Sequence, residues 1–196
     1  MSGTNDLAKR SLIKQSARNL FFHFGFTKTS MDDIARQSGM AKPTLYYYYT
    51  NKESIFNEIV IEEARAFMDS VEQKLPENAA ADEKLAIFFR TTYWDLKQYA
   101  EEMEEVPSYL CDHSPHGRPI VEKINALFRE KMLPMLKAGK EQGVFDFEDE
   151  ETTSAALVFM TDFLNLDWMH RHPEKLRDRV AERVIEIILN GLKRRA

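Results

Sequence analysis

The segment from Thr29 to Lys52 predicts two short helices joined by a tight turn, with a third helix beginning at its end. Gly39 lies between the two helical stretches and supplies the turn. We expect the second short helix to run from about Lys42 to Tyr48. This arrangement is typical of a helix-turn-helix, in which the second helix enters the major groove of DNA.

Local signals support these helix boundaries. Ser30 is followed three residues later by Asp33, which is a capping-box pattern at the start of a helix. Pro43 is tolerated because it lies in the first turn of the second short helix. Asn51 is a suitable cap for a long fourth helix that we expect to reach about Leu75.

Four consecutive tyrosines occupy residues 46–49 of the predicted second helix. Leu45 and Tyr49 are one turn apart, so we expect both to face the small core, with Leu45 packed against Ile34 and Phe21. A helix cannot bury four successive side chains in so small a domain. The outward tyrosines can contact thymine methyls and sugars through their rings and phosphates through their hydroxyls.

The net charge of −5 argues at first against a nucleic-acid partner, but the charges are unevenly distributed. Residues 1–52 hold eight basic and three acidic residues, a local balance of +5, so residues 53–196 carry −10. Phosphate contacts need a basic face rather than a basic protein. The charge distribution therefore favours DNA binding by residues 1–52.

Residues 25–56 resemble the DNA-binding domain of the tetracycline-repressor (TetR) family. The shared residues are Gly25-Phe26, Thr29-Ser30, Asp33-Ile34-Ala35, Gly39, Lys42, Thr44-Leu45-Tyr46 and Asn51-Lys52-Glu53. One departure is Tyr49, where the family usually has phenylalanine. The resemblance implies that Lys42 and Thr44 contact base edges or the adjacent backbone, and that Tyr46, Tyr47 and Tyr48 mainly contact phosphates.

Ser30 and Lys52 lie at helix N-termini, where a phosphate meets exposed amide groups and the positive end of the helix dipole. Our candidate DNA-binding residues are thus Ser30, Lys42, Pro43, Thr44, Tyr46, Tyr47, Tyr48 and Lys52.

The rest of the chain predicts further helices, because seven glycines and seven prolines punctuate 196 residues and no alternating strand pattern is convincing. We expect an all-α fold with an N-terminal three-helix helix-turn-helix domain, residues 1–52, joined to a helical bundle with dimerisation helices, residues 53–196. The predicted helices outside the motif are Asp6–Phe24, Asp82–Met103, Arg118–Gln142, Asp149–His170 and Pro173–Arg194.

The last two predicted helices are apolar over a wide arc, which indicates burial on two sides. We expect a homodimer in which these helices form a four-helix bundle about a two-fold axis, with a fully buried central helix as the alternative. The resemblance also implies an inducer pocket between the C-terminal helices. Candidate lining residues are Phe89, Tyr93, Trp94 and Phe128.

Other classes of function have weaker support. The loop Cys111-Asp-His113-Ser-Pro-His116 holds legitimate zinc ligands, but their spacing matches no common zinc module, and we predict no metal, cofactor or enzyme activity. The acidic run from Glu101 to Glu105 is typical of a solvated face, with a cationic ligand as the alternative. The longest apolar run, Ala155–Met160, is too short for a membrane span, and we expect a cytoplasmic protein.

The sequence therefore favours a transcriptional regulator, most simply a homodimeric repressor of a pseudo-palindromic DNA operator, released by a small hydrophobic or aromatic effector. Such a ligand would move the fourth helix and with it the spacing of the two recognition helices. The alternative is a nucleoid or adaptor protein that binds DNA without a small-molecule inducer.

Overall fold

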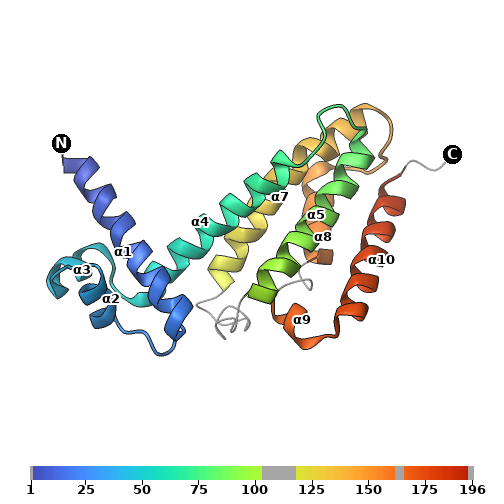
Figure 1. The fold of residues 1–196 in the computed structure, drawn as a ribbon. Coiled ribbons are helices and arrows are strands. Elements are labelled where there is room, and N and C mark those ends of the chain that lie inside the picture. The colour runs from blue at the N-terminus through green and yellow to red at the C-terminus, as the bar shows by residue number, and fades with distance from the viewer. Residues whose placement is uncertain (1, 103–117, 162–165, 194–196) are drawn as a thin grey trace. The chain divides into compact units, whose positions relative to one another are not determined.

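The computed structural model describes residues 2–102, 118–161 and 166–193, which are built from helices apart from turns and one isolated bridge between Phe145 and Lys193 (Figure 1). The predicted all-α class is confirmed. The chain divides into two compact units, the first comprising residues up to Ala64 and the second beginning at Arg65. None of the helices within the described ranges is long and apolar enough to cross a membrane.

The first unit contains α1 (Ser2–Phe24), α2 (Met31–Gln37), α3 (Lys42–Tyr48) and the beginning of α4 (Lys52–Gln73). The predicted helix-turn-helix is therefore present with the predicted bounds for α3. Helix α1 begins four residues before the predicted start at Asp6. Asp6 thus lies inside α1, and its carboxylate accepts a hydrogen bond from the Tyr48 hydroxyl at 2.7 Å.

The capping signals read from the sequence act as predicted. The Asp33 amide donates to the Ser30 hydroxyl at 3.2 Å, and the Ser30 amide donates to the Asp33 carboxylate at 3.0 Å, which completes the capping box of α2. Gly39 has a φ of 64°, a left-handed conformation that a residue with a side chain rarely adopts. Asn51 accepts a hydrogen bond from the Ser54 amide at 2.8 Å and so caps α4.

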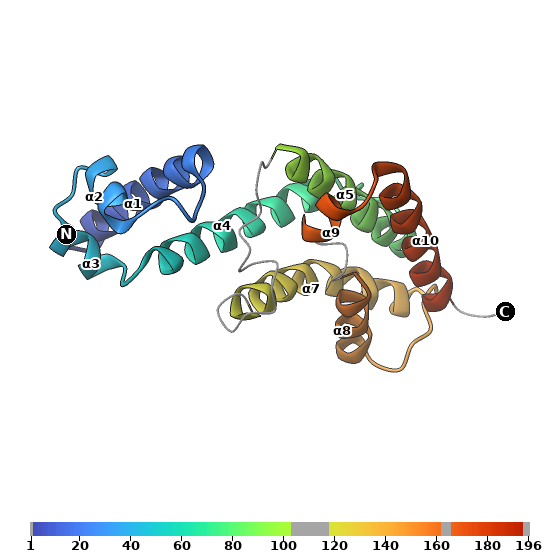
Figure 2. The same cartoon turned by 90° about the horizontal axis from the view of Figure 1, so that it is seen from below.

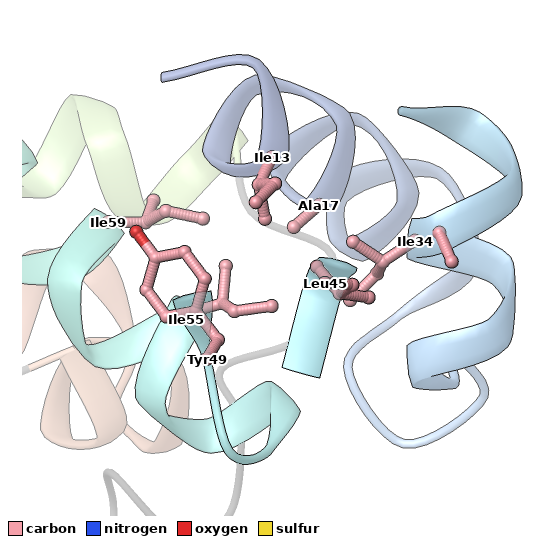
Figure 3. Packing of buried hydrophobic residues seen from close by; sticks show 8 residues of the cluster. Ile13, Ala17, Ile34, Leu45, Tyr49, Ile55 and Ile59 are labelled. Atoms are coloured by element: carbon pink, nitrogen blue, oxygen red, sulfur yellow. The ribbon is translucent and has the colours of Figure 1, made fainter. Parts of the chain in front are cut away.

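A small core holds the helices of the first unit together (Figure 3). Leu45 faces Ile34 across this core, and Phe21 packs against its edge, as the sequence predicts. The ring of Tyr49 is buried as well. The fully buried members come from all four helices and from Tyr49, the residue that follows α3: Ile13, Ala17, Ile34, Ala35, Leu45, Tyr49, Ile55 and Ile59.

The second unit contains the end of α4 together with α5 (Ala81–Glu102), α7 (Arg118–Glu141), α8 (Glu150–Thr161), α9 (Leu166–Arg171) and α10 (Glu174–Leu192). Helices α5, α9 and α10 lie side by side, and α7 packs against both α5 and α8 (Figure 2). The predicted helix Asp149–His170 corresponds to α8 and α9, with residues 162–165 outside the described residues.

The boundary between the two units falls inside α4 rather than at its start. Residues 53–64 pack with the first unit because Ile55 and Ile59 belong to its core. The assignment of residues 1–52 to DNA binding and of residues 53–196 to effector binding and dimerisation stays a prediction.

Gly139, in α7, gives a direct test of packing in the second unit. A Cβ atom at this position would overlap the buried ring of Phe145. We expect Gly139→Ala to lower the free energy of unfolding by about 1–3 kcal/mol, the usual cost of overpacking a core. Chemical denaturation of the purified protein measures this change.

Gly191→Ala is the matched control, because a Cβ at Gly191 in α10 meets no atom within 4 Å. We expect this variant to be as stable as the wild-type protein or more stable by up to about 1 kcal/mol, since alanine favours a helix over glycine. Equal destabilisation by both substitutions would contradict the packing described for Gly139.

Candidate nucleic-acid interface

Helix α3 separates its side chains into a buried face and an outward face. Leu45 and Tyr49 are buried, as predicted from their spacing. Tyr47 is 80% exposed and Tyr46 is 49% exposed, which are high values for aromatic side chains. Lys42 and Pro43 are also exposed, and Thr44 and Tyr48 are half-buried. Six of the eight candidate DNA-binding residues therefore lie on one short helix, and four of these six are exposed.

Tyr48 is the most restrained of the three outward tyrosines. Its hydroxyl donates to the Asp6 carboxylate, and this hydrogen bond raises the pKa of Tyr48 because it favours the protonated phenol. The ring of Tyr47 meets the ring of Tyr48 edge to face, with centroids 5.1 Å apart. Asp6 in α1 therefore fixes the Tyr48 side chain, and Tyr48 in turn limits where Tyr47 can lie.

Glu58 in α4 joins α1 to the end of α3. Its carboxylate accepts hydrogen bonds from Arg10 at 2.6 Å and from the Tyr49 hydroxyl at 3.0 Å, and it pairs with Lys14 at 3.0 Å. Burial raises the pKa of Glu58, but these hydrogen bonds outweigh burial and hold the pKa below its usual value. The Arg10 guanidinium also lies 4.5 Å from the centre of the Tyr49 ring. The carboxylate is thus ionised at neutral pH and fixes the register of α3 against α4.

The two lysines proposed from the sequence have different surroundings. The Lys42 ammonium pairs with Asp32 on α2, and its side chain remains largely exposed. The Lys52 ammonium donates to the carbonyls of Phe26 at 2.8 Å and Thr29 at 2.9 Å, and it lies 4.4 Å from the centre of the Phe26 ring. Lys52 therefore holds the loop between α1 and α2 in place.

A shallow depression of about 480 Å³ lies between the start of α2, α3 and the start of α4. Lys28, Ser30, Tyr46, Thr50 and Lys52 are among the residues that line it. The structure thus brings Ser30, Tyr46 and Lys52 to one concave surface beside the exposed face of α3. The amide and the hydroxyl of Ser30 are both engaged by Asp33 in the capping box.

The electrostatics of the first unit differ from what residues 1–52 alone suggest. Arg10, Lys14 and Arg18 pair with Glu58, Glu62 and Glu63 of α4. With the acidic residues of α4 included, residues 1–64 carry eight basic and seven acidic residues, a net charge of +1 rather than +5. The charge count over residues 1–52 did not include these acidic residues, because they lie between residues 53 and 63.

The four candidate effector-binding residues fall into separate groups within the second unit. Phe89 and Phe128 pack with Phe88, at centroid distances of 5.9 Å and 5.0 Å from the Phe88 ring. Tyr93 is buried beside Met169 and Ala181. Trp94 is exposed, with the Lys97 ammonium 4.8 Å from its ring centre. Phe89 and Phe128 therefore belong to one aromatic core, whereas Tyr93 belongs to another cluster.

The buried hydroxyl of Tyr93 connects α5 to α10. It donates to Asp178 at 2.6 Å, and Lys97 donates to the same carboxylate at 3.1 Å and to Glu174 at 2.7 Å. Burial raises the pKa of Asp178, but the hydrogen bonds from Tyr93 and Lys97 outweigh it and hold that pKa below its usual value. The Asp178 carboxylate therefore stays ionised at neutral pH, and its hydrogen bonds fix α10 on α5.

Helix α10 has a second apolar face besides the one that packs into its own unit. Its buried stripe is Arg177, Ala181, Ile185, Ile188 and Leu192. A neighbouring stripe at helical spacing consists of Leu176, Val180, Val184 and Ile187, of which Leu176 and Ile187 are exposed in the single chain. Helix α8 likewise exposes Phe159 and Met160. The alternative of a fully buried last helix does not fit these exposed side chains.

Asp6 and Glu58 were not predicted as part of this surface. Asp6 pairs with Tyr48 and Glu58 with Arg10, each about 40 or more residues away, and Glu58 also pairs with Tyr49 across the turn between α3 and α4. Their only sequence signal is that each carboxylate interrupts a basic or apolar helical segment. The candidate metal loop from Cys111 to His116 lies outside the described residues. Within the part of the chain that is described, no three His, Cys, Asp or Glu side chains gather at metal-binding distances.

The first unit matches a known protein family. The family of bacterial regulatory proteins named tetR matches residues 13–59, a segment that begins and ends at two members of the first unit's core. The chain is 24% identical over 190 residues to the uncharacterized HTH-type transcriptional regulator YhgD of Bacillus subtilis, covering 94% of this chain and 96% of the relative. It is 25% identical over 192 residues to the HTH-type transcriptional repressor KstR2 of Rhodococcus jostii, covering 94% and 91%.

Solved structures agree with this comparison at the level of the fold. FadR of Thermus thermophilus, a TetR-family transcriptional repressor solved in complex with lauroyl-CoA, has a TM-score of 0.73 to this chain at 23% identity, covering 95% of this chain and 97% of FadR. The matched segment contains the helix-turn-helix, and the relatives span nearly the whole chain. Residues 13–59 therefore form a DNA-binding domain of the TetR family of bacterial regulatory proteins, and relatives described as transcriptional regulators match the chain over nearly its whole length.

Proposed function

We propose that this chain is a homodimeric transcriptional repressor that binds a pseudo-palindromic DNA operator and is released by a small hydrophobic or aromatic effector. The outward face of α3 carries this proposal, because three tyrosines, a lysine and a threonine occupy it while Leu45 and Tyr49 fix it to the core. Exposed aromatic side chains are costly in water and useful against bases and sugars.

Within this surface we assign different contacts to different residues. Lys42, Thr44 and Tyr47 are the candidates for base edges, since they project from the outward face of α3. Tyr46, Tyr48, Ser30 and Lys52 surround that face and are the candidates for phosphates, with Pro43 packing against the backbone.

The small net charge of the first unit bears on affinity. With a net charge of +1 over residues 1–64, hydroxyl and amide donors must supply many of the phosphate contacts. Such contacts release few counterions, so we expect DNA binding that depends less on salt than binding by a strongly basic domain.

An effector is supported by the relatives, among which FadR of Thermus thermophilus was solved with lauroyl-CoA. By analogy, an effector would bind between helices of the second unit and shift α4. A coupling free energy of about 1–3 kcal/mol is the usual scale for such linkage.

A homodimer is supported by the exposed apolar stripe on α10 and by Phe159 and Met160 on α8. A two-fold axis would bring the same stripe of a second copy against it, which is how most homodimers form. The two recognition helices would then read successive major grooves about 34 Å apart.

Tyr47→Ala tests the outward face of α3. We expect at least about tenfold weaker binding to an operator fragment, since a base or sugar contact is lost. Stability should change by less than about 0.5 kcal/mol, because Tyr47 is exposed. Fluorescence anisotropy of a labelled duplex measures the affinity. Phe22→Ala, which removes an exposed aromatic side chain from α1, is the control and should leave the affinity unchanged.

Lys42→Ala and Lys52→Ala separate base reading from phosphate binding. We expect Lys42→Ala to relax the base preference, and Lys52→Ala to weaken binding to all sequences while lowering the salt slope by about one. Lys52→Ala should also lower the melting temperature, because its hydrogen bonds to the carbonyls of Phe26 and Thr29 are lost. A lower melting temperature with an unchanged salt slope would mean that Lys52 stabilises the loop and does not bind phosphate.

Ile187→Glu tests the dimer. A glutamate in the exposed stripe of α10 should convert the dimer to monomer in analytical ultracentrifugation and weaken operator binding, since two half-sites are no longer held together. Arg179→Glu is the control: it introduces a glutamate at an exposed position on the polar side of α10 and should leave the dimer intact. Dissociation by both variants, or by neither, would count against this interface.

A further inference from the structure

One acidic side chain of the first unit is attached to the helix that we propose reads DNA. Asp6 is half-buried in α1, and its carboxylate accepts a hydrogen bond from the Tyr48 hydroxyl at 2.7 Å. Tyr48 is the last residue of α3. A carboxylate in a DNA-binding unit repels the phosphates, so on charge alone Asp6 should weaken DNA binding.

Helix α1 holds Tyr48 at two points. Asp6 and Arg10 are four residues apart and therefore share one face of α1. Asp6 accepts a hydrogen bond from the side chain of Tyr48, and the Arg10 guanidinium donates a longer one, 3.5 Å, to the Tyr48 carbonyl. Arg10 also donates to Glu58 at 2.6 Å, which fixes its own position. The end of α3 is thus held to α1 through both the backbone and the side chain of one residue.

The ring of Tyr48 transmits this restraint to the exposed tyrosine beside it. The rings of Tyr47 and Tyr48 meet edge to face, with centroids 5.1 Å apart and planes at 88°. Tyr47 is 80% exposed, whereas Tyr48 is half-buried, so the contact joins an exposed ring to an anchored one. An edge-to-face pair has a preferred geometry and favours one orientation of the Tyr47 ring. A side chain that is ordered before binding loses less conformational entropy when DNA binds.

The single hydrogen of the Tyr48 hydroxyl limits what this residue can do for DNA binding. A phenol has one donor, and a phosphate oxygen can only accept. While Tyr48 donates to Asp6, it therefore cannot donate to a phosphate as well. Exchange of one anionic acceptor for another would gain little, so the bond already formed in a half-buried place should persist when DNA binds. Tyr48 then serves as a support for Tyr47 rather than as a phosphate donor.

We propose that Asp6 is a positioning residue for DNA recognition, which acts through Tyr48 to hold the Tyr47 ring in the orientation that meets the bases. This role of Asp6 rests on the proposed function, because it requires α3 to read DNA. An acidic residue thereby supports binding to a specific sequence, although its charge opposes binding to any DNA. The two effects have opposite signs and can be separated by experiment.

Fluorescence anisotropy of two labelled duplexes tests this role with the purified protein. One duplex carries the sequence that the protein selects from genomic DNA, and the other is a scrambled sequence of the same composition. We expect Asp6→Ala to weaken binding to the selected duplex about fivefold, because the restraint on Tyr47 is lost. Binding to the scrambled duplex should stay unchanged or strengthen, because a negative charge is removed.

Asp6→Asn is the conservative variant. Its amide oxygen can still accept the hydrogen of the Tyr48 hydroxyl, so this variant should bind the selected duplex at least as tightly as the wild-type protein. Glu62→Ala is the control for charge, because it also removes an exposed carboxylate from the first unit, where Glu62 pairs with Lys14. This control should not weaken binding to the selected duplex. Melting temperatures establish that each variant is folded.

A double-mutant cycle asks whether Asp6 acts through Tyr47. In a protein that already carries Tyr47→Ala, we expect Asp6→Ala to change the affinity for the selected duplex by less than about twofold, because the ring that Asp6 positions is absent. A fivefold loss that persists in this background would overturn the proposal, since Asp6 would then act by another route.

Three further results would overturn the proposal. Unchanged or tighter binding of the selected duplex by Asp6→Ala would mean that Asp6 competes with DNA or has no part in recognition. Equal weakening on both duplexes would mean a general loss of α3, and equal weakening by Asp6→Asn and Asp6→Ala would exclude the hydrogen bond to Tyr48 as the cause. If the wild-type protein binds both duplexes equally, the proposed function fails and this role fails with it, whereas the other results leave the proposed function standing.

Discussion

The burial of Leu45 and Tyr49 is the constraint on which the rest of the first unit depends. Helix α3 spans seven residues, Lys42–Tyr48, which is too short to be stable in water on its own. Leu45 and Tyr49 attach it to Ile13, Ile34 and Ile55, and this attachment decides which side chains point outward. The exposed tyrosines are thus a consequence of packing on the opposite side of the same helix. A substitution at Leu45 would remove the surface by releasing the helix, whereas a substitution at Tyr47 changes the surface alone.

Polar contacts add to the apolar core in fixing the position of α3. The Glu58 carboxylate accepts hydrogen bonds from Arg10 and from the Tyr49 hydroxyl and pairs with Lys14. Tyr49, which follows α3, is therefore held by α4 as well as by the core. Helix α4 continues beyond Ala64 into the second unit. A displacement of α4 at Glu58 would therefore act on Tyr49 directly. Partly buried charge networks of this kind set position more than they add stability. Glu58 thus links the position of α4 to that of α3.

The order of the helices and most of their ends followed from local signals, because caps such as Ser30 and Asn51 and turns such as Gly39 act within a few residues. The buried and exposed sides of α3 followed from helical spacing. Long-range pairing was not accessible in this way: the Arg10–Glu58 and Asp6–Tyr48 contacts join distant segments, and the charge count over residues 1–52 omitted the partners in α4. Nor did spacing reveal that the Lys52 ammonium donates to backbone carbonyls.

We propose that the outward face of α3 reads a specific DNA sequence as part of a symmetric dimer. Selection of bound fragments from the source genome by the purified protein, at a low and a physiological salt concentration, is the decisive measurement. We expect enrichment of one pseudo-palindromic sequence at both salt concentrations, with half-sites about one helical turn of DNA apart or somewhat more. Binding that is uniform across sequences and disappears at the higher salt concentration would contradict it, because phosphate contacts alone would then explain the affinity.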